Sequence, residues 1–216
     1  MPRPEPITPD RLLHALRWRY ATQRFDPSRT IPDDNWHALC ESLRLAPSGF
    51  GLQPWRFISV ETPELRQVLS AASWSQPQIT EAPKLLVLCR RSHVDMGDAE
   101  RLIALARAER AISENEAAQW RAGLGSFLRS GADTAEWAAR QVYLALGTLV
   151  ASAAVLGVDA CPLEGIDPAA YDRVLDLQGS GYTTVLAVAL GYRSTEDPAA
   201  ALPKIRFSPE QVLTRA

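Results

Sequence analysis

The chain has 216 residues, of which 46% are hydrophobic and 22% charged, and its formal net charge is −2. A chain of this length and composition buries a sizeable core without disulfides, so we expect one compact domain over residues 1–216. Residues 1–7 are expected to be a loose, proline-containing lead. The near-neutral charge gives no general attraction for nucleic acid or anionic lipid, so we predict neither as a partner. Anion binding then depends on local groups of Arg and Lys and suits a small ligand.

The cysteines and histidines indicate a reducing compartment and no metal. The cysteines are odd in number, far apart and set among apolar neighbours, as is typical of buried thiols in the cytoplasm; they are Cys40, Cys89 and Cys161. The histidines show no metal-ligand spacing with one another or with cysteine; they are His14, His37 and His93. We therefore predict a cytoplasmic protein without a metal site.

Two helices are predicted in the first 50 residues. Thr8 is a suitable N-cap for a helix that begins at Pro9 and ends between residues 17 and 20, which places Arg19 at the helix exit. Apolar side chains then repeat at helical spacing from Trp36 to Leu43, and this second helix stops before a loop at residues 47–54.

The middle of the chain predicts strands among helices. Residues 55–60, 84–89 and 183–190 have the β-branched, aromatic or continuously apolar character of strands, and a short helix is expected at 64–72. The elements do not alternate as βαβ units, and no Gly-x-Gly-x-x-Gly follows a strand. We therefore expect an α+β sheet packed among helices rather than a Rossmann fold.

Two further helical stretches are predicted after residue 94. Residues 95–120 read as one helix that gives way to a mobile, glycine-containing segment, either a lid or an ordinary surface connection. Residues 135–156 read as a long central helix closed by Gly157. Its apolar part, residues 142–158, approaches the length of a membrane span, but its small residues favour a helix buried in the core or in a subunit interface.

Lys204 and Arg206 are two residues apart in a proline-bounded stretch, so an extended backbone sends both side chains to one face. Lys supplies a point charge and Arg a planar fork of donors, a pair suited to a phosphate, and Arg19 adds a second fork. The alternative for the pair taken alone is two solvated surface charges.

Four motifs occur in a fixed order: Arg-x-x-Thr-x-x-Phe-Asp at 19–26, Pro-Ser-x-x-x-x-Gln-Pro-Trp at 47–55, Pro-x-Glu-Gly at 162–165 and Lys-x-Arg at 204–206. In order and spacing they resemble the FMN-dependent nitroreductase family over nearly the whole chain. The resemblance implies an intertwined α+β homodimer that carries FMN at the subunit interface.

The resemblance also assigns roles to residues. Arg19, Lys204 and Arg206 are expected at the FMN phosphate, the loop at 47–55 over the flavin of the other subunit, and the backbone of residues 162–165 against the isoalloxazine ring. The predicted cofactor-binding residues are Arg19, Tyr20, Ala21, Gln23, Pro47, Ser48, Gly49, Gly51, Ser75, Gln78, Pro162, Leu163, Glu164, Gly165, Lys204 and Arg206. Phe50 and Phe127 are predicted in the substrate pocket, and no catalytic side chain is expected because the flavin carries the chemistry.

This chain also departs from the family pattern. Gln23 and Gln78 stand at the flavin pyrimidine edge where relatives often have basic side chains, and Ser75 stands where Asn is common. Loss of a cation there removes stabilisation of reduced flavin on the order of a few kcal/mol, which predicts a lower reduction potential. Phe50 replaces a small polar residue and either narrows the substrate slot or packs at the dimer interface.

The function implied is ping-pong reduction of nitroaromatics or quinones with NAD(P)H as the hydride donor. Three alternatives remain open at this point. One is the same flavin chemistry on an enone, a halogenated phenol or free flavin. The second is a flavin-binding protein with little turnover, and the third is a flavin-free dimer in which Arg19, Lys204 and Arg206 are surface charges.

Overall fold

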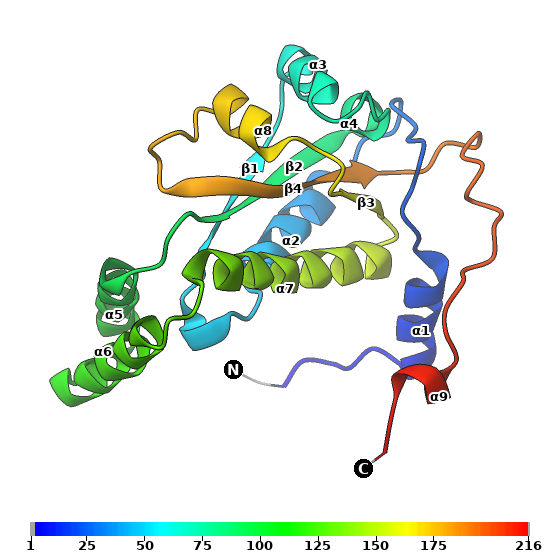
Figure 1. Ribbon diagram of the computed structural model, residues 1–216. Coiled ribbons are helices and arrows are strands. Elements are labelled where there is room, and N and C mark those ends of the chain that lie inside the picture. The colour runs from blue at the N-terminus through cyan, green and yellow to red at the C-terminus, as the bar shows by residue number, and fades with distance from the viewer. Residues whose placement is uncertain (1–2, 216) are drawn as a thin grey trace.

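The computed structural model describes residues 3–215 and contains one four-stranded sheet (Figure 1). Its strands are β1 (Trp55–Ser59), β2 (Lys84–Arg91), β3 (Asp159–Leu163) and β4 (Tyr182–Gly191). They lie in the order β1-β2-β4-β3, and every neighbouring pair is antiparallel. The sheet packs among helices, so the predicted α+β class is confirmed.

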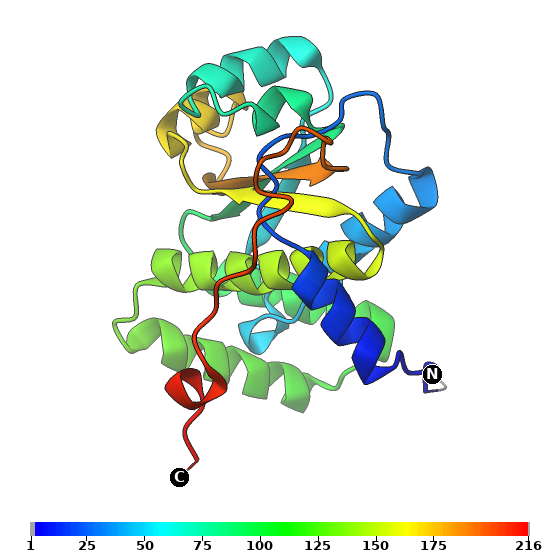
Figure 2. The same ribbon diagram turned by 90° about the vertical axis from the view of Figure 1, so that its right-hand side faces the viewer.

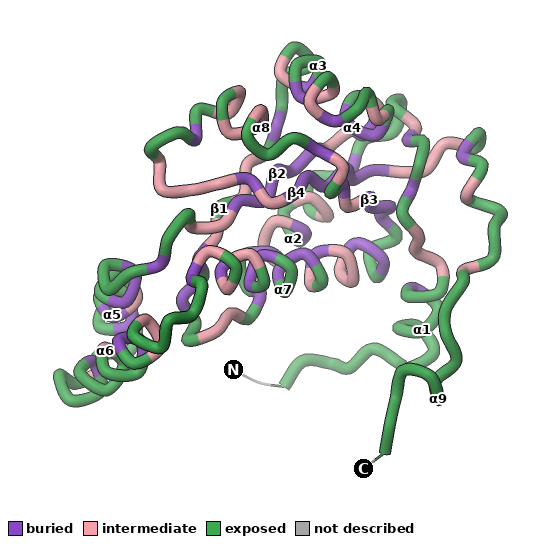
Figure 3. Tube along the Cα trace, viewed as in Figure 1, coloured by how far each residue is buried: buried purple, intermediate pink, exposed green. Residues whose placement is uncertain are grey.

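Helices cover both faces of the sheet, as Figure 1 shows. One face packs against α2 (Asp33–Arg44) and α7 (Thr134–Val155), the other against α3 (Pro63–Ala71), α4 (Gln78–Glu81) and α8 (Pro168–Val174). Side chains alternate along β2, so Leu86 and Leu88 join the α2–α7 core while Leu85 and Val87 join the core beneath α3 and α8. Burial on both faces explains why β2 is a continuous apolar run. The buried residues in Figure 3 accordingly follow the sheet and the inner side of α7.

The long helix α7 is the central helix predicted from the sequence. It is long and apolar enough by length and composition to cross a membrane. Nevertheless Val142, Ala145 and Leu149 are fully buried against the sheet, which confirms the prediction of a core helix. The turn that follows contains Gly157 at a φ of 68°, a left-handed conformation that costs glycine little.

The N-terminal helices also agree with prediction. Helix α1 (Pro9–Trp18) begins at Thr8, whose side chain accepts a hydrogen bond from the backbone N–H of Arg11, and it ends with Arg19 as C-cap. Residues 3–8 form no helix or strand, whereas Met1 and Pro2, the rest of the predicted lead, lie outside the described residues.

The prediction of one helix at 95–120 followed by a mobile glycine segment is wrong. The chain forms two helices, α5 (Met96–Arg110) and α6 (Glu114–Arg129), and both Gly123 and Gly125 lie inside α6. The break occurs because Ala111 adopts a left-handed φ of 50° and Ser113 starts a new helix with a capping box to Glu116. α6 forms despite the cost of these two glycines, with Ala117 and Leu124 buried and Arg121 binding Glu100 of α5 at 2.7 Å.

Strand β3 was not predicted, and it forms one edge of the sheet. Pro162 lies within it, which is tolerated because an edge strand need not donate on its outer side. On that outer side Ala21 forms an isolated parallel bridge with Ala160. Beyond β4 the C-terminal segment runs past the end of α1 to the short helix α9 (Pro209–Val212), as Figure 2 shows.

Candidate functional site

The three predicted phosphate residues lie together although they come from opposite ends of the chain. Arg19, Lys204 and Arg206 line one cavity of about 570 Å³, which we call the cation hollow. Lys204 fixes the arrangement because its Nζ donates to the carbonyl of Leu16 at 2.6 Å and to the carbonyl of Arg19. Among residues 3–215, no carboxylate forms an ion pair with any of the three cations.

The charges in the cation hollow destabilise one another. Burial, and after it the charge of Arg206, lowers the pKa of Arg19. Burial and then the charges of Arg19 and Arg206 lower the pKa of Lys204. A pKa that is lowered in this way means that the charged form is held at a cost, and a bound anion would remove that cost. The hollow is therefore suited to an anion such as a phosphate.

Tyr20 and Ala21, predicted beside the phosphate, both line the cation hollow. The hydroxyl of Tyr20 donates to Asp197 at 2.9 Å, and the same carboxylate accepts from the backbone N–H of Gln23 at 2.8 Å. Burial and then this bond to Asp197 raise the pKa of Tyr20 to about 12. The phenol is thus already occupied within the protein, and we expect it to stay neutral.

Gln23 and Gln78, predicted at one edge of the flavin, contact each other. The Nε2 of Gln78 donates to the Oε1 of Gln23 at 3.3 Å, and the Nε2 of Gln23 donates to the carbonyl of Ala21 at 2.8 Å. Gln78 is only 3% exposed, and its own Oε1 has no hydrogen-bond partner within residues 3–215. An unpartnered buried carbonyl is costly, so this oxygen is suited to a donor from outside the chain.

The turn before α4 packs on the end of the Pro-x-Glu-Gly motif. Trp74 and Ser75 both have left-handed backbones, with φ of 50° and 56°, and Trp74 is 77% exposed. A Cβ on Gly165 would lie 2.6 Å from the Trp74 ring, so a side chain at this position would require the exposed ring to shift. Gln76 completes the contact by donating to the carbonyl of Gly165 at 2.6 Å. Ser75 was predicted from the sequence, whereas Trp74 and Gln76 were not, because they lie far from Gly165 in the sequence and meet it only in the fold.

The motif itself begins in the sheet and leaves it. Pro162 and Leu163 are the last residues of β3, with Leu163 buried, and Glu164 lies beyond the strand. The hydroxyl of Tyr143 on α7 donates to Glu164 at 2.8 Å. Burial, followed by this bond, raises the pKa of Tyr143 to about 12. Glu164 is thereby oriented as a hydrogen-bond acceptor.

The loop at residues 47–54 is held by α7. It contains the 3₁₀ turn η1 (Gly49–Gly51), and the backbone N–H of Gly49 donates to Gln141 at 2.8 Å. A Cβ on Gly49 would lie 2.7 Å from the Trp137 ring, so glycine is required there. Ser48 accepts from the backbone N–H of Gln53 at 2.9 Å, and Pro47 precedes it on the exposed surface. The loop is thus a defined turn although it was predicted only as a loop.

The two residues predicted in the substrate pocket lie in one aromatic cluster. The ring centroids of Phe50 and Phe127 are 5.6 Å apart, and the Trp137 ring lies 5.1 Å from that of Phe127 and is tilted by 50° to it. Phe50 has a left-handed φ of 56° and remains 54% exposed. It also lines a mainly apolar cavity of about 380 Å³ between α5, α6 and the loop. This cavity shares no lining residue with the cation hollow, so within one chain the two ends of the site are separate.

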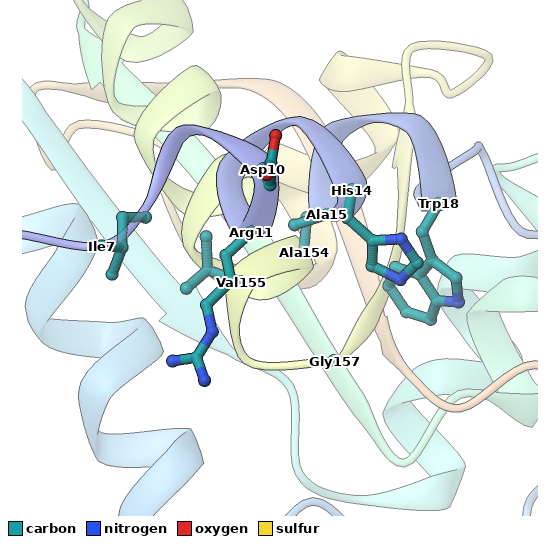
Figure 4. A pocket seen from close by; sticks show the side chains of 9 residues that line it. All are labelled: Ile7, Asp10, Arg11, His14, Ala15, Trp18, Ala154, Val155 and Gly157. Atoms are coloured by element: carbon teal, nitrogen blue, oxygen red, sulfur yellow. The ribbon is translucent and has the colours of Figure 1, made fainter.

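A larger cavity of about 750 Å³ lies between α1 and the end of α7 (Figure 4). Figure 4 shows His14 and Trp18 side by side at one end of it and Ile7 at the other. Apart from Trp18 it shares no residue with the cation hollow, and it contains none of the predicted site residues. It therefore plays no part in the candidate site.

Comparison with known proteins gives the geometry a context. A model of the nitroreductase family matches residues 16–192. A protein of Staphylococcus haemolyticus with the provisional name NAD(P)H nitroreductase is 30% identical over 215 residues, which cover 94% of this chain and 95% of that protein.

Solved structures agree on the fold. A provisionally named nitroreductase of Bacillus subtilis superimposes with a TM-score of 0.83 at 20% identity, covering 96% of this chain and 99% of that one. One from Exiguobacterium sibiricum, solved in complex with FMN, superimposes with a TM-score of 0.76 at 18% identity, covering 95% and 97%. The family match spans the helix exit, the loop, the sheet and the Pro-x-Glu-Gly motif that form most of the candidate site. The chain therefore belongs to the nitroreductase family.

Proposed function

We propose that this protein is a cytoplasmic, homodimeric FMN-dependent oxidoreductase that uses NAD(P)H to reduce small electron-poor acceptors such as nitroaromatics and quinones. The observation that carries the proposal is the cation hollow, where Arg19, Lys204 and Arg206 meet without a carboxylate partner among residues 3–215. Family membership supports FMN as the ligand, because the S. haemolyticus relative is named for NAD(P)H and the E. sibiricum structure holds FMN.

The residues present fit FMN at both of its ends. The hollow offers two guanidinium forks and an ammonium to the phosphate, which are the strongest phosphate donors in proteins. At the other end the unpartnered Oε1 of Gln78 would accept a hydrogen bond from the N–H of the ring. Gly165 has no side chain to cover its backbone, and its neighbours there are the exposed Trp74 ring and Gln76, which donates to its carbonyl.

The chemistry that bound FMN supplies is the transfer of electrons from a nicotinamide to an acceptor. The protein binds and orients the reactants, and a ping-pong order follows if donor and acceptor occupy the same face in turn. Glu164, held by Tyr143, orients its turn rather than moving a proton. Phe50 and Phe127 form an apolar wall that excludes water and accepts a flat aromatic ring by stacking.

We propose a homodimer for two reasons. A single chain leaves the candidate site open, and it exposes apolar side chains on its surface. The cavity lined by Phe50 is separate from the cation hollow of the same chain. A second copy would bring its own loop over the flavin of the first copy. Large apolar side chains are exposed on α7 and along the C-terminal segment; they are Tyr143, Leu144, Val155, Leu202, Ile205, Phe207, Val212 and Leu213. Exposed apolar surface of this extent is typical of a subunit interface.

The visible spectrum of the purified protein, before and after anaerobic NADH or NADPH, tests the proposal. We expect a flavin spectrum that bleaches with one nicotinamide and returns when a quinone or nitroaromatic is added. Return of the spectrum only with an enone, a halogenated phenol or free flavin would change the acceptor. Flavin that stays oxidised would favour a binding protein, and absence of flavin after incubation with FMN would overturn the proposal.

A further inference from the structure

Arg193 follows the end of β4, and its guanidinium lies between two aromatic rings. The guanidinium carbon is 4.3 Å from the ring centroid of Trp18 and 4.4 Å from that of Tyr20. These two residues flank Arg19 in the sequence. A cation held between two ring faces fixes both rings, so Arg193 restrains the backbone on each side of Arg19.

The position of Arg193 is itself fixed by Asp159, the first residue of β3. Asp159 is 3% exposed and accepts from the Nη2 of Arg193 at 2.6 Å, from its Nε at 3.0 Å and from its backbone N–H at 2.9 Å. The hydroxyl of Thr22 donates to the same carboxylate at 3.4 Å. A bidentate pair of this kind needs the planar fork of arginine, which lysine does not have.

The charge of Arg193 is neutralised by Asp159, although Arg193 lines the cation hollow with Arg19, Lys204 and Arg206. Its contribution to anion binding is therefore one of geometry. The segment that contains Arg19 is held on one side by Arg193 and on the other by Lys204, which donates to the carbonyl of Arg19. We propose that Arg193 is a positioning residue that orients Arg19 toward the phosphate group of the flavin, an inference that rests on the proposed function.

This role makes a prediction that a purely structural role does not. If Arg193 acts through Arg19, replacing Arg193 reduces the affinity for FMN, which has a phosphate, much more than the affinity for riboflavin, which has none. If it only supports the fold, both affinities fall together.

The experiment measures dissociation constants for FMN and for riboflavin by flavin fluorescence. The variants are Arg193→Lys, which keeps the charge, and the pair Arg193→Gln with Asp159→Asn, which leaves no buried charge unpaired and keeps the net charge. Arg173→Gln on α8 is a control for a change of charge away from the hollow. We expect both Arg193 variants to bind FMN about tenfold or more weakly, with riboflavin binding changed less than about threefold, because a displaced Arg19 loses its charge-assisted hydrogen bonds to the phosphate.

Either of two results would overturn the inference: wild-type affinity for FMN in both Arg193 variants, or an equal loss for FMN and riboflavin. Wild-type protein that binds riboflavin and FMN equally would instead show that the hollow does not take the phosphate, which would overturn the role proposed for Arg19, Lys204 and Arg206 as well. Thermal unfolding of each variant without flavin shows whether the comparison is made on folded protein.

Discussion

The cation hollow and the aromatic loop stand at the two ends of the candidate site, and they are built in different ways. The hollow joins residues from both ends of the chain through hydrogen bonds to backbone carbonyls and to two carboxylates, Asp159 and Asp197. The loop instead depends on close approach, with Gly49 against Trp137 and Phe50 in a left-handed conformation that remains exposed. One end is complete within a single chain, whereas the other presents an apolar surface to a second molecule.

The largest expected effect is at the hollow. The double change Lys204→Gln with Arg206→Gln should weaken FMN binding about 100-fold or more, because it removes two charged donors worth about 1.5–3 kcal/mol each. Fluorescence titration measures this, with riboflavin as the matched ligand and Arg110→Gln on α5 as a control for the loss of one positive charge elsewhere. Unchanged FMN affinity in the double variant would show that the phosphate binds elsewhere.

Replacing Gly49 and Gly165 by alanine tests how rigid the structure is around each glycine. Gly49→Ala should lower the free energy of unfolding by about 1–3 kcal/mol, because its Cβ meets the Trp137 ring within an aromatic cluster. Gly165→Ala should cost less, because the exposed Trp74 ring can swing away. Urea unfolding without flavin measures both, and Gly123→Ala, with open space around it, should be neutral or stabilising. A larger cost for Gly165→Ala than for Gly49→Ala would reverse this comparison.

A positive charge in place of Gln23, which contacts Gln78, should raise the reduction potential of the flavin. Gln23→Lys is expected to raise the midpoint potential by about 35–60 mV, because a positive charge at about 6–10 Å and an effective dielectric near 20 stabilises the anionic reduced flavin. Anaerobic titration against a reference dye measures the shift. Gln67→Lys on the surface of α3 is the control, and an equal rise there would mean that general charge, not position, sets the potential.

At the loop, Phe50→Ser should raise KM for aromatic acceptors several-fold, since a stacked aromatic pair contributes about 0.5–1.5 kcal/mol. The KM for ferricyanide, which cannot stack, should stay unchanged. If both acceptors respond alike, Phe50 supports the interface between subunits rather than the substrate.

The smallest expected effect is a pH dependence of FMN binding. The pKa of Lys204 is lowered, so its charge is lost at a lower pH than the usual lysine value of about 10.4. As the pH rises, the affinity for FMN should therefore start to decrease before the pH reaches about 10.4. Without flavin the sign is opposite, because the unfolded chain binds more protons in that window and stability therefore rises with pH. Lys204→Arg should remove the fall in affinity, and a fall that persists in this variant would exclude Lys204 as its cause.

The elements predicted correctly from the sequence are those whose pattern of apolar residues matches the faces that they bury. β2 and α7 are long and buried, so their patterns are clear. Arg19 was predicted at a helix exit, and Lys204 was predicted from a proline-bounded Lys-x-Arg pair and from the family resemblance. β3 escaped because it has five residues, one of them proline, and owes its existence to pairing with β4. The break between α5 and α6 depends on a left-handed Ala111, a conformation that its residue type does not indicate.

The candidate site followed the same division. The structure brings Gln23 to Gln78 and Phe50 to Phe127, while their contacts with flavin and substrate stay predictions. Trp74 and Arg193 were missed because their importance comes from what they touch, Gly165 in one case and the rings beside Arg19 in the other. Contacts between segments distant in sequence leave no local periodicity.

The outer side of β3 has a consequence for solubility. An exposed sheet edge is a template on which another chain can add a strand and begin aggregation. Here Ala21 already occupies the position opposite Ala160, and Pro162 has no N–H to offer. The strand that carries the proposed flavin contact is therefore also closed to unwanted strand addition, so replacing Pro162 would expose the protein to self-association even where its redox activity survived.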